Sequence, residues 1–130
     1  MAYAELLCLT NFSFQLGASH PRELVERAKE LGYTALAITD ECSLAGIVRA
    51  HEAAETVNLP LIIGSQFRFE EGDRVALLAP TQAGYSQICE LITKARRRAR
   101  KGTYSLSRTD FDGAISETIE IGRASCRERV

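Results

Sequence analysis

Residues 35–46 are Ala35-Leu36-Ala37-Ile38-Thr39-Asp40-Glu41-Cys42-Ser43-Leu44-Ala45-Gly46, a short apolar run that ends in polar residues. A helical pattern follows, with Ser43 as a candidate capping residue. Buried parallel strands have continuous apolar runs of this kind, and α/β proteins place their functional groups where such strands end. The segment therefore predicts a parallel sheet with Asp40 and Glu41 at its functional edge.

The rest of the chain extends this pattern. Strands are expected over residues 3–9, 35–39, 59–66 and 74–79, and helices over residues 21–31, 44–56 and 82–101. The first helix has the features of a helix start, since His20 precedes Pro21 and the acidic Glu23 lies in the first turn. The alternation of strands and helices predicts βαβ units and an α/β fold.

Composition limits the class of protein. The chain has 130 residues, of which 45% are hydrophobic, as expected for at most one globular domain. Its net charge of −1 does not suggest a nucleic-acid-binding domain. Cys8, Cys42 and Cys89 form no CxxC pair, so neither a disulfide framework nor a zinc ribbon is supported. With no long apolar run and no signal-peptide pattern, a soluble cytoplasmic protein is expected.

Three segments carry a resemblance to a known family: residues 4–13, 35–46 and 62–67. Their order and spacing resemble the PHP domain (polymerase and histidinol phosphatase), and more narrowly the N-terminal region of bacterial error-prone DNA polymerases of the DnaE type, relatives of the polymerase III alpha subunit. The resemblance covers residues 2 to about 111. It implies a partial, TIM-like α/β fold, about half of a distorted β/α barrel with parallel strands.

The resemblance also implies where metal ligands would lie. PHP phosphoesterases bind divalent metals with His, Asp and Glu side chains at strand ends, which lowers the pKa of bound water. The family's ligand positions correspond here to Leu7, Leu9, Leu16, Glu41 and Gln66. Leucine cannot bind a metal, and the glutamine carboxamide is a poor substitute for a carboxylate. The metal site is therefore predicted to be vestigial.

Asp40 and Glu41 remain as weak candidate ligands, for instance for Mg²⁺. The alternative for Asp40 is a structural role, in which its carboxylate accepts backbone N–H groups of the following loop and helix. His20 and His51 match no family ligand position, and a capping or surface role is expected for each. No catalytic residue is predicted.

The most charged segment is residues 94–101, in which six of eight residues are cationic. Cations at the end of a helix complement its dipole. Alternatively, they contact phosphates or an acidic partner. No aromatic residue is interleaved, so base stacking is not indicated. The candidate contact residues are Lys94, Arg96, Arg97, Arg98, Arg100 and Lys101.

The last ten residues have a different interpretation. Residues 121–130 are the direct translation of ATC GGA AGA GCG TCG TGT AGG GAA AGA GTG, a common short-read sequencing adapter. Residues 121–130 are therefore expected to be a cloning or assembly scar, and residues 1–120 the N-terminal part of a PHP domain. A genuine polar tail is the alternative.

The leading functional hypothesis is an N-terminal PHP fragment of an error-prone DNA polymerase that acts in replication and mutagenic repair. The fragment itself would be structural and inactive, without a cofactor of its own, whereas the resemblance implies Mg²⁺ for the parent polymerase. Implied partners are the remainder of the polymerase, DNA, and a sliding clamp or mutagenesis accessory proteins. The alternatives are a free-standing PHP phosphoesterase or exonuclease, and a metal-free interaction module.

Overall fold

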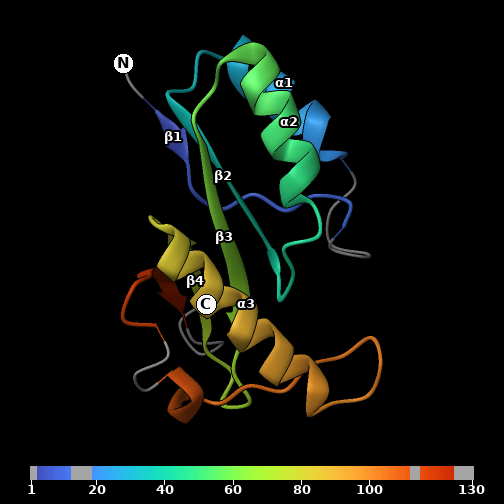
Figure 1. The fold of residues 1–130 in the computed structure, drawn as a ribbon, viewed down its shortest axis with the longest axis vertical. Coiled ribbons are helices and arrows are strands. Elements are labelled where there is room, and N and C mark those ends of the chain that lie inside the picture. The colour runs from blue at the N-terminus through green and yellow to red at the C-terminus, as the bar shows by residue number, and fades with distance from the viewer. Residues whose placement is uncertain (1–2, 13–18, 112–114, 125–130) are drawn as a thin grey trace.

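The computed structural model describes residues 3–12, 19–111 and 115–124 (Figure 1). In chain order, the elements are β1 (Ala4–Glu5), α1 (Pro21–Glu30), β2 (Ala35–Glu41), α2 (Ile47–Val57), β3 (Leu61–Arg68), β4 (Arg74–Ala79), α3 (Gln82–Arg97), a 3-10 turn (Arg108–Phe111) and β5 (Ile119–Ala124). The five strands form one curled sheet in the order β1-β2-β3-β4-β5. The alternation of strands and helices that the sequence predicts is present.

The sheet is mixed. β1, β2 and β3 are parallel, as predicted. β4 runs antiparallel to β3, and β5 antiparallel to β4, so the expectation of parallel strands is corrected for this half of the sheet. The reason is a tight turn after β3, in which Phe69 N–H donates to the Asp73 carbonyl at 2.9 Å and Gly72 adopts a φ of 100°. Such a hairpin reverses the chain without a crossover helix.

Two apolar clusters hold the helices on the sheet. The first joins α1 and α2 to β2, with Val25 and Ile38 fully buried. The second joins α3 to β3 and β4 through Phe67, Leu77 and Ile88. Figure 1 shows α1 and α2 side by side over one end of the sheet and α3 at the other end. Burial of each such large side chain contributes about 1.5–3 kcal/mol.

Element boundaries differ from the expected ones most at β1, α2 and α3, whereas β2 (Ala35–Glu41) and β3 (Leu61–Arg68) end two residues later than expected. β1 is shorter than residues 3–9, because the chain beyond Glu5 contacts β2 through irregular hydrogen bonds. α2 begins at Ile47, and the hydroxyl of Ser43 accepts the N–H of Ala45 instead of capping the helix. α3 ends at Arg97, so residues 98–101 lie beyond it. The start of α1 agrees with the prediction, with His20 as its N-cap.

β5 includes part of the predicted scar. Ile121 pairs with Ala76 and Ala124 pairs with Arg74, so residues 121–124 lie in a strand at the edge of the sheet. Residues 125–130 lie outside the described residues. Strand pairing does not determine where a sequence comes from, so the division at residue 120 remains a prediction.

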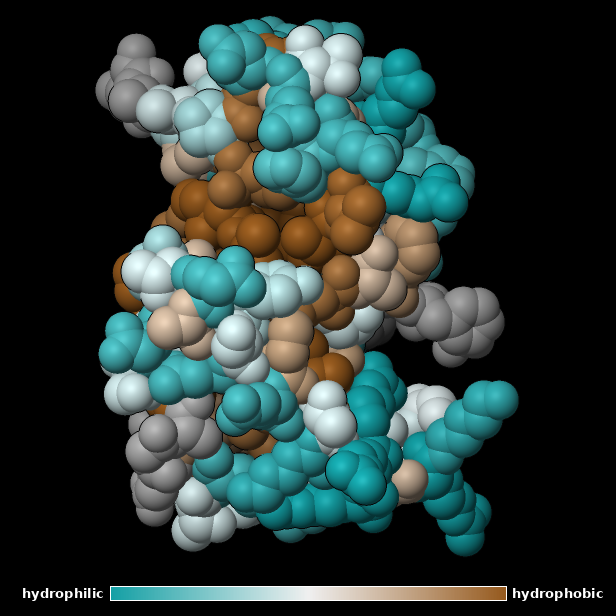
Figure 2. All heavy atoms as spheres, in the orientation of Figure 1, coloured by the Kyte–Doolittle hydropathy of each residue, from teal (hydrophilic) through white to brown (hydrophobic). Residues whose placement is uncertain are grey.

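A band of hydrophobic residues crosses the waist of the molecule between α2 and α3 (Figure 2). The hairpin between β3 and β4 explains it, because no crossover helix covers the sheet there. A groove of about 430 Å³ lies in this region, lined in part by Val48, Ile63 and Tyr85. No helix within the described ranges is long and apolar enough to cross a membrane.

Candidate functional site

The ends of β2 and β3 meet at one edge of the sheet, where the segment after β1 joins them. Glu41, the last residue of β2, pairs with Gln66 of β3. The segment after β1 continues beside β2, where the N–H of Thr39 donates to the Cys8 carbonyl at 2.8 Å. The three segments that the sequence predicts to meet are therefore together. We call the following residues the strand-end cluster: Thr10, Thr39, Asp40, Glu41 and Gln66.

Asp40 is bound on both carboxylate oxygens by one residue. The N–H of Thr10 donates to Asp40 Oδ1 at 2.6 Å, and the Thr10 hydroxyl donates to Oδ2 at 2.8 Å. Both residues are almost completely buried, with Asp40 only 1% exposed. Gly46, the N-cap of α2, packs against them so closely that a Cβ there would lie 3.1 Å from Asp40 Oδ2. The carboxylate thus joins the segment after β1 to the start of α2.

Thr39 and Gln66 form a second contact in the strand-end cluster. The hydroxyl oxygen of Thr39 accepts the N–H of Cys8 at 3.0 Å and the side-chain amide of Gln66 at 3.2 Å. Because Gln66 uses the N–H₂ group that a glutamate lacks, its amide serves here as a donor. A glutamate at this position could not make this bond.

Glu41 contacts a residue far away in the sequence. The hydroxyl of Tyr104 donates to Glu41 Oε1 at 2.7 Å and accepts the N–H of Arg68 at 2.9 Å. Burial, followed by the hydrogen bond to Glu41, raises the pKa of Tyr104 well above its usual value. The phenol is therefore a stable donor at neutral pH, and Glu41 joins β2 to the loop after α3.

The donor set does not fit the family's metal cluster. The side chain of Leu7 is 48% exposed, Leu9 is half-buried, and neither offers a donor atom. Leu16 lies outside the described residues. Within the described ranges, no group of three or more His, Cys, Asp or Glu side chains could hold an ion. Of the five family ligand positions, three are leucines and one is the amide of Gln66, so only Glu41 offers a carboxylate.

Two cysteines lie beside the cluster. Burial raises the pKa of the Cys8 thiol to about 11, and that of Cys42 to about 11 as well. Both thiols are therefore protonated at neutral pH, and neither is a ready nucleophile.

The two histidines lie elsewhere. The N–H of His20 donates to Glu23 Oε1 at 3.0 Å, and its ring Nδ1 lies 3.0 Å from the Asn11 amide. His51 is on the exposed side of α2, 3.2 Å from Glu55. These positions agree with the capping and surface roles expected from the sequence.

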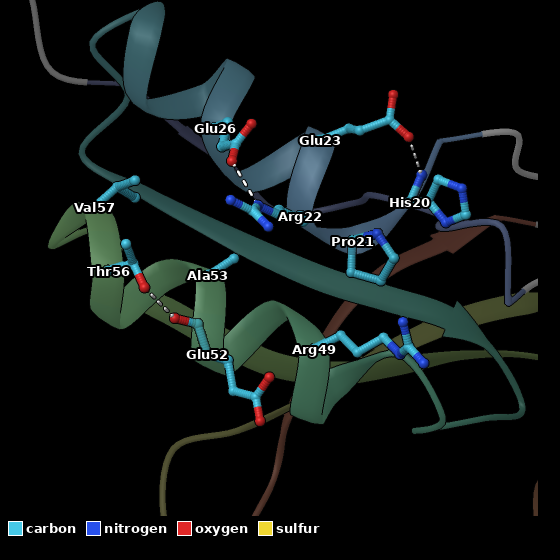
Figure 3. A pocket seen from close by; sticks show the side chains of 10 residues that line it. All are labelled: His20, Pro21, Arg22, Glu23, Glu26, Arg49, Glu52, Ala53, Thr56 and Val57. Carbon is cyan, nitrogen blue, oxygen red and sulfur yellow. Dashed lines mark hydrogen bonds and ion pairs between the residues drawn. The ribbon is translucent and has the colours of Figure 1, made fainter.

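His20 also lines a cleft of about 490 Å³ between α1 and α2, shown in Figure 3. Among the charged residues that line this cleft, Arg22 pairs with Glu26, one turn along α1, at 2.8 Å. The exposed partners make this pair worth little energetically. Thr56, whose hydroxyl also lines the cleft, donates to the backbone carbonyl of Glu52 at 3.0 Å.

Three of the six cations in residues 94–101, the basic segment, make contacts within the protein. Arg98 and Lys94 pair with the buried Asp110 at 2.6 and 3.2 Å, and the Arg98 hydrogen bond in particular holds the pKa of Asp110 well below its usual range. Arg96 donates to the carbonyls of Cys42 and Thr103 and lies over the Tyr104 ring. These three cations of the basic segment therefore have structural roles.

Sequence analysis missed several residues of the site. Thr10 and Gly46 lie within the segments that carry the resemblance, residues 4–13 and 35–46, but they carry no signal of their own. Tyr104 and Asp110 contact residues 63 and 12 positions away. Only the fold brings such pairs together, so the single sequence could not have revealed them.

A curled α/β sheet with a polar cluster at the ends of its parallel strands places the chain in the TIM-like class. Two solved structures share this fold at a TM-score of 0.60. One is a candidate metal-dependent phosphoesterase from Bifidobacterium adolescentis, 28% identical, covering 73% of this chain and 34% of its own. The other is an amidohydrolase from Chromobacterium violaceum, 22% identical, covering 72% of this chain and 33% of its own. The chain belongs to the PHP domain family, which matches residues 5–122.

Within this family, curated relatives indicate a narrower group. The error-prone DNA polymerase of Pseudomonas savastanoi pv. phaseolicola is 63% identical over 119 residues, which are 92% of this chain and 12% of the relative. That of Aromatoleum aromaticum is 60% identical over 121 residues, 92% of this chain and 11% of the relative. The chain thus spans about one eighth of the length of the relatives it matches.

Proposed function

We propose that this chain is the N-terminal PHP region of a bacterial error-prone DNA polymerase, and that its strand-end cluster is a structural scaffold. The identity to error-prone polymerases over 92% of the chain supports the first part. The second part rests on one observation: Thr10 occupies both oxygens of the buried Asp40 at 2.6 and 2.8 Å. A carboxylate held in this way stabilises the fold.

The activity of the whole polymerase would reside outside this chain. By resemblance, the parent enzyme copies damaged DNA in the cytoplasm with deoxynucleoside triphosphates and Mg²⁺, using acidic residues of a palm domain. A sliding clamp or mutagenesis accessory proteins would bind elsewhere on it. In this proposal, the PHP region packs against the polymerase body and contributes no hydrolytic step.

A hydrolysis assay tests the scaffold proposal. The purified chain, with Mn²⁺, Zn²⁺ or Mg²⁺, is incubated with a phosphomonoester and with end-labelled DNA. We expect no turnover above that of the Asp40→Asn, Glu41→Gln double variant, which keeps the side-chain shapes. Metal-dependent turnover that the double variant lacks would establish the competing function, a PHP phosphoesterase or exonuclease.

A further inference from the structure

The basic segment at the end of α3 has more cations than its contacts explain. Six of the sixteen lysines and arginines lie within residues 94–101, although the chain as a whole carries a net charge of −1. Lys94, Arg96 and Arg98 are held by Asp110 and by backbone carbonyls. The remaining three cations of the segment are Arg97, Arg100 and Lys101, which we call the basic turn.

No acidic partner holds the basic turn in the part of the chain that the structure describes. The Arg97 side chain borders a shallow depression of about 600 Å³, which Lys94, Arg98 and a single acid, Glu90, also line. Arg97, Arg100 and Lys101 are all exposed. The buried Asp110 is already bound by two other cations of the segment, Lys94 and Arg98.

The helix dipole explains only one of these three positions. Its effect is confined to the last turn of a helix. α3 ends at Arg97, so Arg100 and Lys101 lie beyond it. Three cations, Lys94, Arg96 and Arg97, lie in that last turn, so Arg97 is the one member of the basic turn placed to complement the dipole. A charge-complementing role therefore leaves most of the basic turn unexplained.

The basic turn is held in a defined shape. The N–H and the hydroxyl of Thr103 donate to the Arg100 carbonyl at 3.0 and 2.7 Å, and Gly102 supplies the positive φ of 89° that the turn needs. Arg96 anchors the same turn from the other side by donating to the Thr103 carbonyl at 3.2 Å. Cations on an ordered backbone lose less entropy on binding than cations on a flexible tail.

We infer that the basic turn, Arg97, Arg100 and Lys101, binds the phosphodiester backbone of DNA. Guanidinium groups match the geometry of phosphate oxygens, and exposed lysines add unpaired positive charge. Tyr104, the nearest aromatic residue in the sequence, lies under Arg96 and donates to Glu41, so it is not available to stack on a base. We therefore expect this contact to be independent of the DNA sequence. DNA is favoured over an acidic protein because this inference rests on the proposed polymerase function.

Fluorescence anisotropy with the full 130-residue chain tests this. The probes are labelled single-stranded and duplex DNA of about 20 nucleotides, titrated at about 50 and 200 mM salt. The test variant is Arg97→Gln, Arg100→Gln, Lys101→Gln. The matched control, Arg22→Gln, Arg27→Gln, Lys29→Gln, removes three exposed cations from α1. Circular dichroism melts verify that both variants keep the fold.

We expect the test variant to bind about tenfold or more weakly than the control, which should bind like the unsubstituted chain. Three phosphate contacts also imply that the salt slope falls by about 2 for single strands and about 3 for duplex, which distinguishes the two forms. Equal affinity of the two variants would overturn the inference. So would competition by polyglutamate as effective as that by DNA, which would indicate an acidic protein partner. Neither result depends on the hydrolysis assay, so failure of the DNA-binding inference can be told apart from failure of the scaffold proposal.

Discussion

Thr10 and Asp40 form a buried two-point contact, in which the backbone N–H and the hydroxyl of Thr10 donate to the two oxygens of the Asp40 carboxylate. The hydroxyl oxygen also accepts the N–H of Phe12 at 3.1 Å. In a PHP domain, this edge of the sheet is where a metal would be held. Here Thr10, from the segment after β1, donates to both oxygens of Asp40, which is a candidate ligand but not one of the family's ligand positions.

Replacing Thr10 tests how much this contact stabilises the fold. Thr10→Val keeps the shape but removes the hydroxyl that donates to Oδ2 of the buried Asp40. We expect a loss of about 2 kcal/mol in the free energy of unfolding, measured by urea denaturation. Thr10→Ser keeps the hydroxyl and is the matched control. Equal stability of the two variants would show that the hydroxyl contributes nothing.

The contact of Glu41 with Tyr104 is tested by a double-mutant cycle. Glu41→Ala and Tyr104→Phe each remove one partner of the 2.7 Å hydrogen bond. We expect a coupling free energy of about 1 kcal/mol, because the donor is half-buried and the acceptor is charged. Additive effects on the free energy of unfolding would mean that the two residues do not support each other.

The pH dependence of stability tests the Asp110 contacts. Arg98 and Lys94 hold the pKa of Asp110 below its usual range, so its ionised form stabilises the folded state. The advantage over Asp110→Asn should be complete at neutral pH, decline as the pH falls below about 4, and disappear below the depressed pKa. Urea midpoints at several pH values measure it. Glu26→Gln, which breaks an exposed pair with Arg22, should change stability little at any pH.

Truncation tests the origin of the C-terminal segment. Deleting residues 121–130 removes the pairs of Ile121 and Ala124 with β4 but keeps those of Ile119 and Glu120. If the segment is an adapter scar, it was never selected to pack, and the melting temperature should stay the same or rise slightly. A clear fall in the melting temperature of the 120-residue chain would mean that the end of β5 is native structure.

The sequence predicts the parallel part of the fold well because each element carries a local signal. In β2, the apolar residues 35–38 are followed by three polar residues. His20, Pro21 and Glu23 mark the start of α1. The direction of β4 was missed although the sequence contains it: residues 67–73, between the expected strands 59–66 and 74–79, are too few for the crossover that a parallel pair needs. Thr10 and Tyr104 were missed since hydrogen bonds between distant segments leave no periodic pattern.

The most direct test of the account is a thermal melt with and without divalent metal. An ion that binds only the folded chain, at about 100 times its dissociation constant, stabilises it by about 2.7 kcal/mol and raises the melting temperature by several degrees. With Mn²⁺ or Zn²⁺ at about 1 mM, the account predicts no rise beyond that in a salt-matched control. A rise that grows with metal concentration and is absent in Asp40→Asn would contradict it, and would show that Asp40 still binds a metal.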